Sequence, residues 1–331
     1  MYRSVFILLI LSAAFLFSQD PPDPPDAVTK VGTSAANWLK IESGTRGIAM
    51  GGSQVASGRG LSGVFFNPAS IAFINKSEFY FSKSDYLAGI THNTIGFARR
   101  LTPTDYFGLH LFYLDSGDMD VTTVPSPDGT GETFNVLDIS FRLMYGKQLT
   151  DRLRMGASVK YIREQIYTVQ MQSFLFDLGS NFKTGVMGIM LGMSVSNFGP
   201  DVQFQGDGLV TEEDDSPSGF DKKITEKFSV PLVFRLGLQK NIIGDEDGSM
   251  QRLTVSADAI NPIDYTVYGS LGMEYSFSNL AFFRTGTRLF HDTAGWSVGG
   301  GVKWSIFAVD YAYVNYGILE ETHQFGISLE F

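Results

Sequence analysis

The residue types that most often carry chemistry are sparse in this chain. Its 331 residues include no cysteine and only four histidines. No histidine stands at metal-ligand spacing from another, and the absence of cysteine excludes disulfides and thiolate metal sites. The sequence therefore predicts no catalytic residue, no metal site and no cofactor, and we expect a protein that is not an enzyme. The histidines are His92, His110, His291 and His323.

Two acidic runs are the next candidates for a site. They are Asp115, Asp118 and Asp120, and the run from Glu212 to Asp215. Neither has the spacing of an EF-hand calcium loop, so hydrated loops are the favoured interpretation. The net charge of −10 also argues against a nucleic-acid partner, which needs a basic face.

The segment from Gly44 to Ala72 has the most unusual composition. It is rich in glycine and small residues and has almost no charge. Glycine interrupts any strand alternation, and each interior glycine costs a helix about 1 kcal/mol relative to alanine. Such a segment is ordered only when a larger structure encloses it, so we expect a plug. The candidate plug or gate residues are Gly51, Gly52, Asn67, Pro68 and Ala69.

Two interpretations of Asn67-Pro68-Ala69 remain open on the sequence alone. Pro68 fixes the local backbone and biases Asn67 toward extended geometry. Asn67 would then bond plug backbone, and the small Ala69 would allow tight packing. The alternative is that Asn-Pro simply starts a turn.

The rest of the chain predicts the enclosure. Charged residues make up 18% and aromatic residues 14%, yet after the N-terminus no run approaches the ~20 apolar residues of a spanning helix. Apolar and polar residues alternate with period two, as in Leu137 to Tyr145, over segments of about ten residues. We expect an all-β fold, a transmembrane antiparallel β-barrel of about 14 strands over residues 77–331, with the plug at 35–76.

The connections between these strands support a barrel. Counting back from the C-terminus, every second connection is compact, whereas the long polar stretches 115–134 and 199–229 both belong to the other set. Short turns at one rim and long loops at the other are typical of outer-membrane barrels.

Both chain ends suggest export to the outer membrane. Residues 1–19 have a positive start and a short apolar core, which predicts a cleaved signal peptide, followed by a Pro-rich linker over residues 20–34. The last strand alternates apolar residues and ends on an aromatic one. This pattern resembles the signal read by the outer-membrane assembly machinery, and its residues are Phe325, Ile327, Leu329 and Phe331. The expected location is the outer membrane of a Gram-negative-type bacterium, with membrane lipid as a partner.

The N-terminal block resembles the FadL superfamily of outer-membrane proteins, and within it the PorV/PorQ branch. The resemblance is carried by Trp38 to Ile41, Gly44 to Gly47, Ala49 to Gly52 and Phe66 to Ala69. One departure is that Ala56 to Gly60 reads Ala-Ser-Gly-Arg-Gly where the family has acidic residues.

This resemblance implies two functions. PorV/PorQ-like proteins are accessory barrels of type IX protein secretion, with secretion components or secreted cargo as partners. FadL-like proteins instead take up long-chain fatty acids or other hydrophobic compounds, and their plug acts as a gate. The resemblance of the N-terminal block favours the secretion role, with hydrophobic uptake as the alternative and a purely structural or adhesive barrel as a third class.

Overall fold

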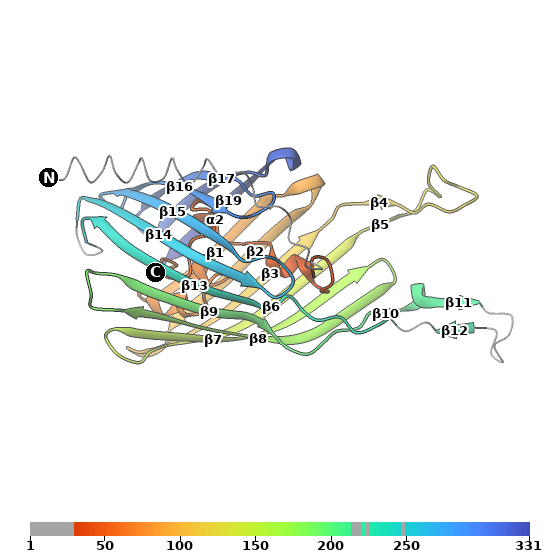
Figure 1. The fold of residues 1–331 in the computed structure, drawn as a ribbon, viewed down its shortest axis with the longest axis horizontal. Helices are drawn as coiled ribbons and strands as arrows, with labels where there is room; N and C mark the ends of the chain where they lie inside the picture. Colours follow the sequence, from red (N-terminus) through yellow and green to blue (C-terminus); the bar gives the residue numbers. More distant parts are fainter. Residues whose placement is uncertain (1–29, 213–219, 223–224, 246–248) are drawn as a thin grey trace.

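In the computed structural model the chain forms a closed antiparallel β-barrel (Figure 1). The structure describes residues 30–212, 220–222, 225–245 and 249–331. Among them, 14 strands run around the wall in sequence order, and the pairing of β1 with β19 closes the ring. These strands are β1 (Ser77–Asp85), β2 (Thr91–Arg100), β3 (Asp105–Asp115), β6 (Val136–Gln148), β7 (Leu153–Ile166), β8 (Val169–Lys183), β9 (Met190–Phe198), β13 (Val233–Ile243), β14 (Gln251–Pro262), β15 (Tyr268–Phe277), β16 (Ala281–Leu289), β17 (Trp296–Trp304), β18 (Phe307–Asn315) and β19 (Glu321–Glu330).

The side chains on the outer face of the wall are mainly apolar. Along β8, Phe174, Phe176 and Leu178 are exposed and alternate with the buried Leu175 and Asp177. Exposed large apolar side chains occur on strands all around the barrel. An apolar exterior with alternate residues turned inward is the pattern of a barrel that faces lipid. The predicted fold class is therefore confirmed.

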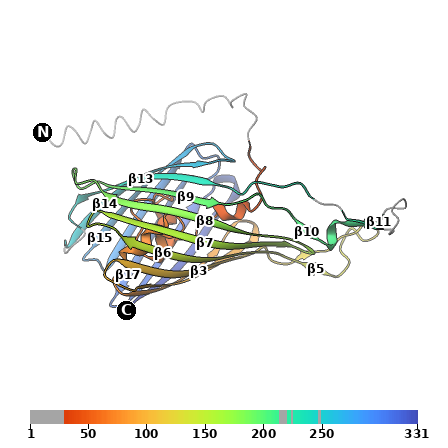
Figure 2. The same ribbon diagram turned by 90° about the horizontal axis from the view of Figure 1, so that it is seen from below.

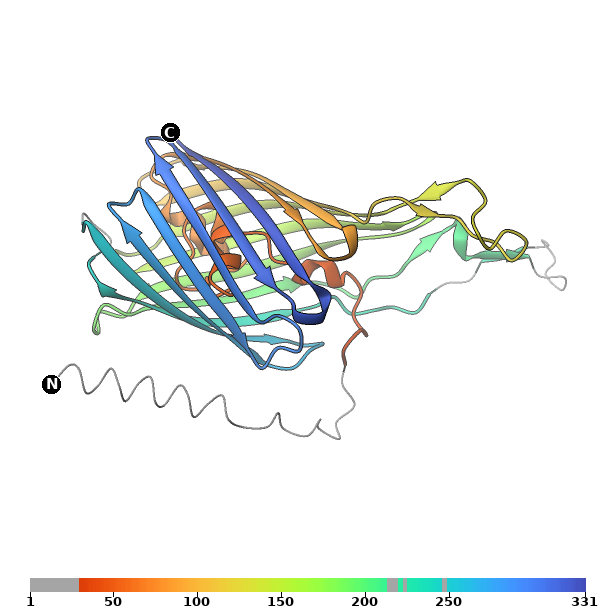
Figure 3. The ribbon, with the colours of Figure 1, turned by 90° about the horizontal axis from the view of Figure 1, so that it is seen from above.

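The two rims of the barrel differ. Both long connections leave the same rim, which we call the loop rim, and the C-terminus lies at the opposite rim (Figures 1 and 3). As the sequence predicted, these connections follow β3 and β9. The first acidic run, from Asp115 to Asp120, lies where the connection after β3 begins. The short strands within them are β4 (Met119–Asp120), β5 (Thr133–Phe134), β10 (Gln205–Gly206), β11 (Val210–Glu212) and β12 (Phe220–Lys222).

The terminal strand β19 lies between β1 and β18. Ser77 and Phe331 exchange two backbone hydrogen bonds of 3.0 Å at the point of closure. Phe325 and Ile327 are exposed on the outer face, as is Phe331, while Leu329 is half-buried there. The role of this strand as an assembly signal stays a prediction.

The segment over residues 35–76, where the sequence predicts the plug, lies inside the barrel (Figures 2 and 3). Its backbone is mostly irregular, with four short helical turns, and Ala49, Val55 and Ala69 are completely buried. Because the wall surrounds it, this segment is a plug. Its helical turns are η1 (Asn37–Lys40), α2 (Thr45–Ala49), η2 (Leu61–Gly63) and η3 (Pro68–Phe73); three others, η4 (Leu87–Gly89), η5 (Asp207–Leu209) and η6 (Gly317–Leu319), lie in the connections.

Inward-facing glycines of the wall make room for the plug. A Cβ atom at Gly272 would lie 2.2 Å from Ser53 Oγ and 2.6 Å from the Met50 carbonyl oxygen. A Cβ atom at Gly286 would lie 2.2 Å from the Gly51 nitrogen. Such distances are shorter than any real Cβ contact, so the plug fits only because these side chains are absent. Similar approaches to plug atoms occur at Gly146, Gly156, Gly179, Gly192, Gly237, Gly299 and Gly326.

No helix within the described residues is long and apolar enough to cross a membrane. The predicted signal peptide at residues 1–19 and the linker residues before 30 lie outside the described part of the chain, as does most of the second acidic run.

The glycine contacts predict that the loss of stability caused by a glycine-to-alanine substitution depends on its position in the wall. Replacing Gly272 by Ala should lower the thermal unfolding midpoint, because overpacking a tight site costs about 1–3 kcal/mol. Gly269→Ala on the same strand is the matched control, since its Cβ would have no neighbour closer than 3.7 Å. Circular dichroism in detergent measures both midpoints. Equal midpoints for the two variants would contradict the tight fit.

Candidate functional site

The Asn67-Pro68-Ala69 sequence forms the start of η3. Asn67 has an extended backbone, with φ −157° and ψ 115°, and Pro68 is the first helical residue. The Ala69 backbone N–H donates to Asn67 Oδ1 at 3.0 Å, which is an N-cap hydrogen bond. The same three residues that suggested a turn therefore begin a helical turn, and the asparagine side chain caps it.

The side-chain nitrogen of Asn67 also joins the plug to the wall. It lies 2.8 Å from the Val55 carbonyl oxygen of the plug, and 3.0 Å from the Ser180 carbonyl oxygen and 2.5 Å from Asn181 Oδ1, both on β8. Its two hydrogens are shared among these three acceptors. Gly179 of β8 leaves the necessary space, because a Cβ there would lie 2.0 Å from Asn67 Oδ1. The bond to Val55 agrees with the expected tie to plug backbone, whereas the contact with β8 was not predictable from the sequence.

The other two candidate plug residues contact a different part of the wall. Gly51 and Gly52 have φ angles of +66° and +84°, which favour glycine. The Gly51 N–H donates to Ser297 Oγ of β17 at 2.9 Å. A Cβ at Gly52 would lie 2.7 Å from the Glu42 carboxylate. The structure therefore does not bring these glycines to the Asn67 contact on β8.

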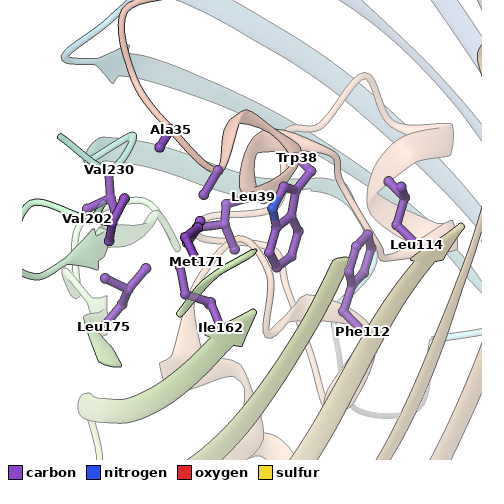
Figure 4. Close-up of a cluster of buried hydrophobic side chains, with 11 residues drawn as sticks. Ala35, Trp38, Leu39, Phe112, Leu114, Ile162, Met171, Leu175, Val202 and Val230 are labelled. Atoms are coloured by element: carbon purple, nitrogen blue, oxygen red, sulfur yellow. The ribbon is translucent and has the colours of Figure 1, made fainter. Parts of the chain in front are cut away.

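The half of the lumen near the loop rim contains a cluster of buried apolar side chains, which we call the apolar chamber (Figure 4). Trp38 of η1 lies at its centre and stacks on Phe112 of β3 with a ring separation of 5.8 Å. The Trp38 Nε1–H donates to Glu164 Oε2 of β7 at 3.1 Å, so its polar atom is satisfied. The other chamber residues are Ala35, Ala36, Leu39, Leu114, Ile162, Met171, Leu175, Val202 and Val230.

The chamber is almost full. A remaining cavity of about 20 Å³ lies among residues that include Trp38, Leu39, Phe65 and Arg142. This volume holds about one water molecule and no organic ligand. The η1 turn therefore closes the chamber in this conformation. The apolar residues that surround Trp38 come from several distant strands, so the sequence alone did not predict the pocket that η1 fills.

The wall beside the chamber is irregular. The pairing register of β8 with β9 shifts between Phe176 and Leu178, so Asp177 faces an extra residue of β9, a β-bulge. Asn197 in the bulge has φ 65°, and its backbone N–H donates to Asp177 Oδ1 at 2.8 Å. Lys160 Nζ lies 2.7 Å from the same oxygen. This buried carboxylate and its partners hold the bulge in place.

A second irregularity lies on the outer face of the same strands. An apolar groove of about 440 Å³, the outer groove, crosses β8, β9, β13 and β14. The outward-facing Leu178, Met193, Phe234 and Leu236 line it, and Ser180 lies in its floor. The Ser180 carbonyl is one of the acceptors near Asn67, so the plug touches the wall directly behind the groove.

Another cavity opens at the loop rim. It has a volume of about 390 Å³, and we call it the mouth pocket. Tyr86 and Tyr316 line one part of it, and Tyr265, Tyr268 and His291 line another. It is therefore an aromatic cavity formed by connections and strand ends together with the η1 region.

The half of the lumen near the short-turn rim is charged. Glu274 of β15 accepts from Arg46 of the plug at 2.8 Å and from Arg284 of β16 at 2.7 Å, and Arg284 also pairs with Asp310. These residues line a cavity of about 290 Å³. The half near the loop rim thus holds the apolar chamber with the Asp177–Lys160 and Glu42–Arg288 pairs beside it, whereas ion pairs around Glu274 dominate the other half, and the plug separates the two halves.

The comparisons with known proteins agree with this architecture. Neither a protein-family model nor a curated protein sequence matches the chain. The fold is similar to the toluene transporter TbuX from Ralstonia pickettii, with a TM-score of 0.57 at 13% identity, covering 88% of this chain and 100% of that one. It is similar to the toluene transporter TodX from Pseudomonas putida, with a TM-score of 0.56 at 13% identity over 86% and 96% of the chains. A FadL homologue from Pseudomonas aeruginosa gives a TM-score of 0.54 at 14% identity over 87% and 98%.

These similarities define the class of fold. The chain is a 14-stranded barrel with an internal plug, of the architecture found in FadL-type outer-membrane proteins. At 13–14% identity the likeness shows this shared fold and leaves substrate and partner to be argued from the site.

The contacts of Asn67 predict a loss of stability when they are removed. Asn67→Ala deletes the η3 cap, worth about 0.5–2 kcal/mol, and removes the donor for acceptors buried at the plug–wall contact. We expect a lower thermal midpoint and faster proteolysis of the plug. Asn75→Ala is the control, because Asn75 is exposed. A variant at position 67 as stable as the control would contradict the tie to β8.

Proposed function

We propose that this protein is an outer-membrane channel for the uptake of small hydrophobic compounds, such as long-chain fatty acids or aromatic hydrocarbons. The apolar exterior suits the hydrocarbon layer of a membrane. The long acidic loops would then face the outside of the cell. The fold shared with toluene transporters supports this function over an unrelated barrel function.

One observation carries the proposal: apolar side chains lie on both faces of the wall beside the β8–β9 bulge. Leu175 belongs to the chamber inside, and Leu178, three residues along the same strand, lines the outer groove. A hydrophobic compound released from the chamber at this point would pass Asp177 and Lys160 of the bulge, but not the ion pairs around Glu274 in the other half of the lumen. The bulge interrupts the regular ladder of hydrogen bonds between β8 and β9.

The conformation described here is the closed one. The chamber has no room for a substrate while Trp38 and Leu39 occupy it. Access from the loop rim requires η1 to move, whereas the Asn67 region can stay bonded to β8. The plug therefore acts as a gate through its first turn.

The resemblance of the N-terminal block also implies an accessory role in type IX secretion. That role rests on the residues of the block, and the comparisons give it no further support. It predicts that deleting the gene blocks cargo export and leaves uptake of hydrophobic compounds unchanged. Our proposal predicts that deleting the gene reduces uptake of hydrophobic compounds and leaves cargo export unchanged.

Trp38 should limit the uptake rate. Trp38→Ala removes the side chain that fills the chamber, and such a change in a packed core costs about 3–5 kcal/mol of packing. We expect uptake of radiolabelled oleate or toluene to rise several-fold in a host that lacks other hydrophobic-compound channels. Trp304→Ala is the matched control, since Trp304 is 76% exposed on the outer face. Uptake no faster than that of the control would contradict gating by η1.

A crosslink across the bulge tests the exit through the wall. Leu178 and Val195 are cross-strand partners of β8 and β9, and the natural chain has no cysteine that could interfere. A disulfide between Leu178→Cys and Val195→Cys should reduce uptake, and a reductant should restore it. The control pair is Met273→Cys with Thr285→Cys, partners on β15 and β16. Undiminished uptake by the oxidised protein would contradict a lateral exit here.

A further inference from the structure

The mouth pocket has features that the proposed channel function does not explain. A channel for any hydrophobic compound needs only an apolar opening. This cavity instead combines aromatic rings with fixed polar groups, and it is large enough for a small ligand, since ligand pockets span about 300–1,000 Å³.

The aromatic rings form two groups that come from different parts of the chain. Tyr86, after β1, and Tyr316, after β18, meet edge to face with ring centres 6.0 Å apart. Tyr268 at the start of β15 meets His291 edge to face at 4.9 Å. Tyr265 lies 5.4 Å from the same histidine ring. Rings held at these angles offer both faces and edges to a further aromatic ring.

Four charged side chains line the pocket, and each is already bonded: Lys40, Glu42 and Arg288 are in ion pairs, and Asp292 accepts from the Tyr265 hydroxyl at 2.5 Å. Arg288 Nη2 lies 2.6 Å from Glu42 Oε2, and Lys40 Nζ lies 2.8 Å from Asp264 Oδ2. A charged ligand would have to compete with these partners. The pocket is therefore suited to a neutral molecule.

His291 is the lining residue whose neutral hydrogen-bond donor is fixed by its surroundings. His291 Nδ1 accepts backbone N–H groups of Thr293 at 3.3 Å and Ala294 at 3.1 Å, so the ring proton of the neutral histidine is on Nε2. Burial and the nearby Arg288 lower the pKa of His291 to about 4, which keeps it neutral at pH 7. The Nε2–H is thus a neutral donor on a ring that lines the pocket beside Tyr265 and Tyr268.

The mouth pocket also adjoins the gate. Ile41, the C-cap residue directly after η1, lines both the mouth pocket and the small cavity in the chamber. A ligand in the mouth pocket would therefore contact the segment that must move to open the chamber.

We infer that the mouth pocket binds a small neutral aromatic compound that carries an oxygen substituent, with the ring among the tyrosines and the oxygen accepting from His291 Nε2–H. This assignment deepens the proposed function, on which its role as the first capture site rests. It names a substrate class more polar than a plain hydrocarbon.

Binding of p-cresol and of toluene to the full chain in detergent tests this assignment, with calorimetric heats corrected for partition into empty micelles. We expect saturable binding of p-cresol that is about fivefold tighter than the binding of toluene. This ratio of affinities is what one additional neutral hydrogen bond contributes. Tyr268→Ala should weaken the binding of p-cresol about tenfold. Tyr161→Ala, on the outer wall beside Phe174, is the matched control and should change nothing.

His291→Phe keeps an aromatic ring and removes the donor, so the preference for p-cresol over toluene should disappear in this variant. No saturable p-cresol binding, binding unchanged by Tyr268→Ala, or a preference unchanged by His291→Phe would each overturn the assignment. If the Trp38 variant still accelerates uptake in that case, the channel function stands without this site. If p-cresol binds as expected but no variant takes up oleate, toluene or p-cresol, the channel function fails and the binding site stands.

Discussion

The contact between wall glycines and plug backbone is the constraint on which the rest of the structure depends. At Gly286 and Gly156 a Cβ atom would lie within about 2.5 Å of plug backbone atoms, so the two surfaces touch without side chains between them. Backbone in the middle of a barrel must also have its hydrogen-bonding groups satisfied. Bonds such as those from Gly51 to Ser297 and from Val55 to Asp258 meet this need with polar side chains of the wall. The inner face of the barrel is therefore complementary to one position of the plug.

The same contacts determine where apolar and charged side chains lie in the lumen. Where the plug is held most tightly, there is no space for a ligand, and the apolar chamber is kept apart from the ion pairs around Glu274. The buried Asp177 belongs to this division, because it satisfies the backbone of the bulge and the ammonium group of Lys160 where the chamber meets the wall. Buried ions of this kind add little net stability, but they fix geometry, since breaking one partner leaves an uncompensated charge.

The sequence predicted the barrel well because its signals are local. Period-two alternation, the parity of loop lengths and the glycine-rich composition of residues 44–72 each follow from neighbours along the chain. The extended Asn67 was also predictable, because Pro68 restricts the residue before it. The Asn67 contact with Ser180 and the approach of Trp38 to Phe112 were not predictable, because they join residues far apart in the chain and depend on strand register. The mouth pocket was missed for the same reason: Tyr86, Tyr265 and Tyr316 share no motif, and His291 gave no signal at metal-ligand spacing.

The contacts also decide which part of the plug can open. The segment from α2 to η3 is held by backbone contacts with glycines on many strands, and any slide of this segment would break bonds worth about 0.5–1.5 kcal/mol each at several places at once. The η1 turn is held differently, by apolar packing, the Trp38–Glu164 bond, the Lys40–Asp264 pair and a backbone bond from Ala35 to Ser229 near the rim. An incoming apolar ligand can replace the packing of Trp38 in the chamber, whereas it offers nothing in place of the backbone bonds deeper in the barrel. If the protein takes up hydrophobic compounds as we propose, its substrate would therefore displace the first turn and leave the remainder of the plug bound to the wall.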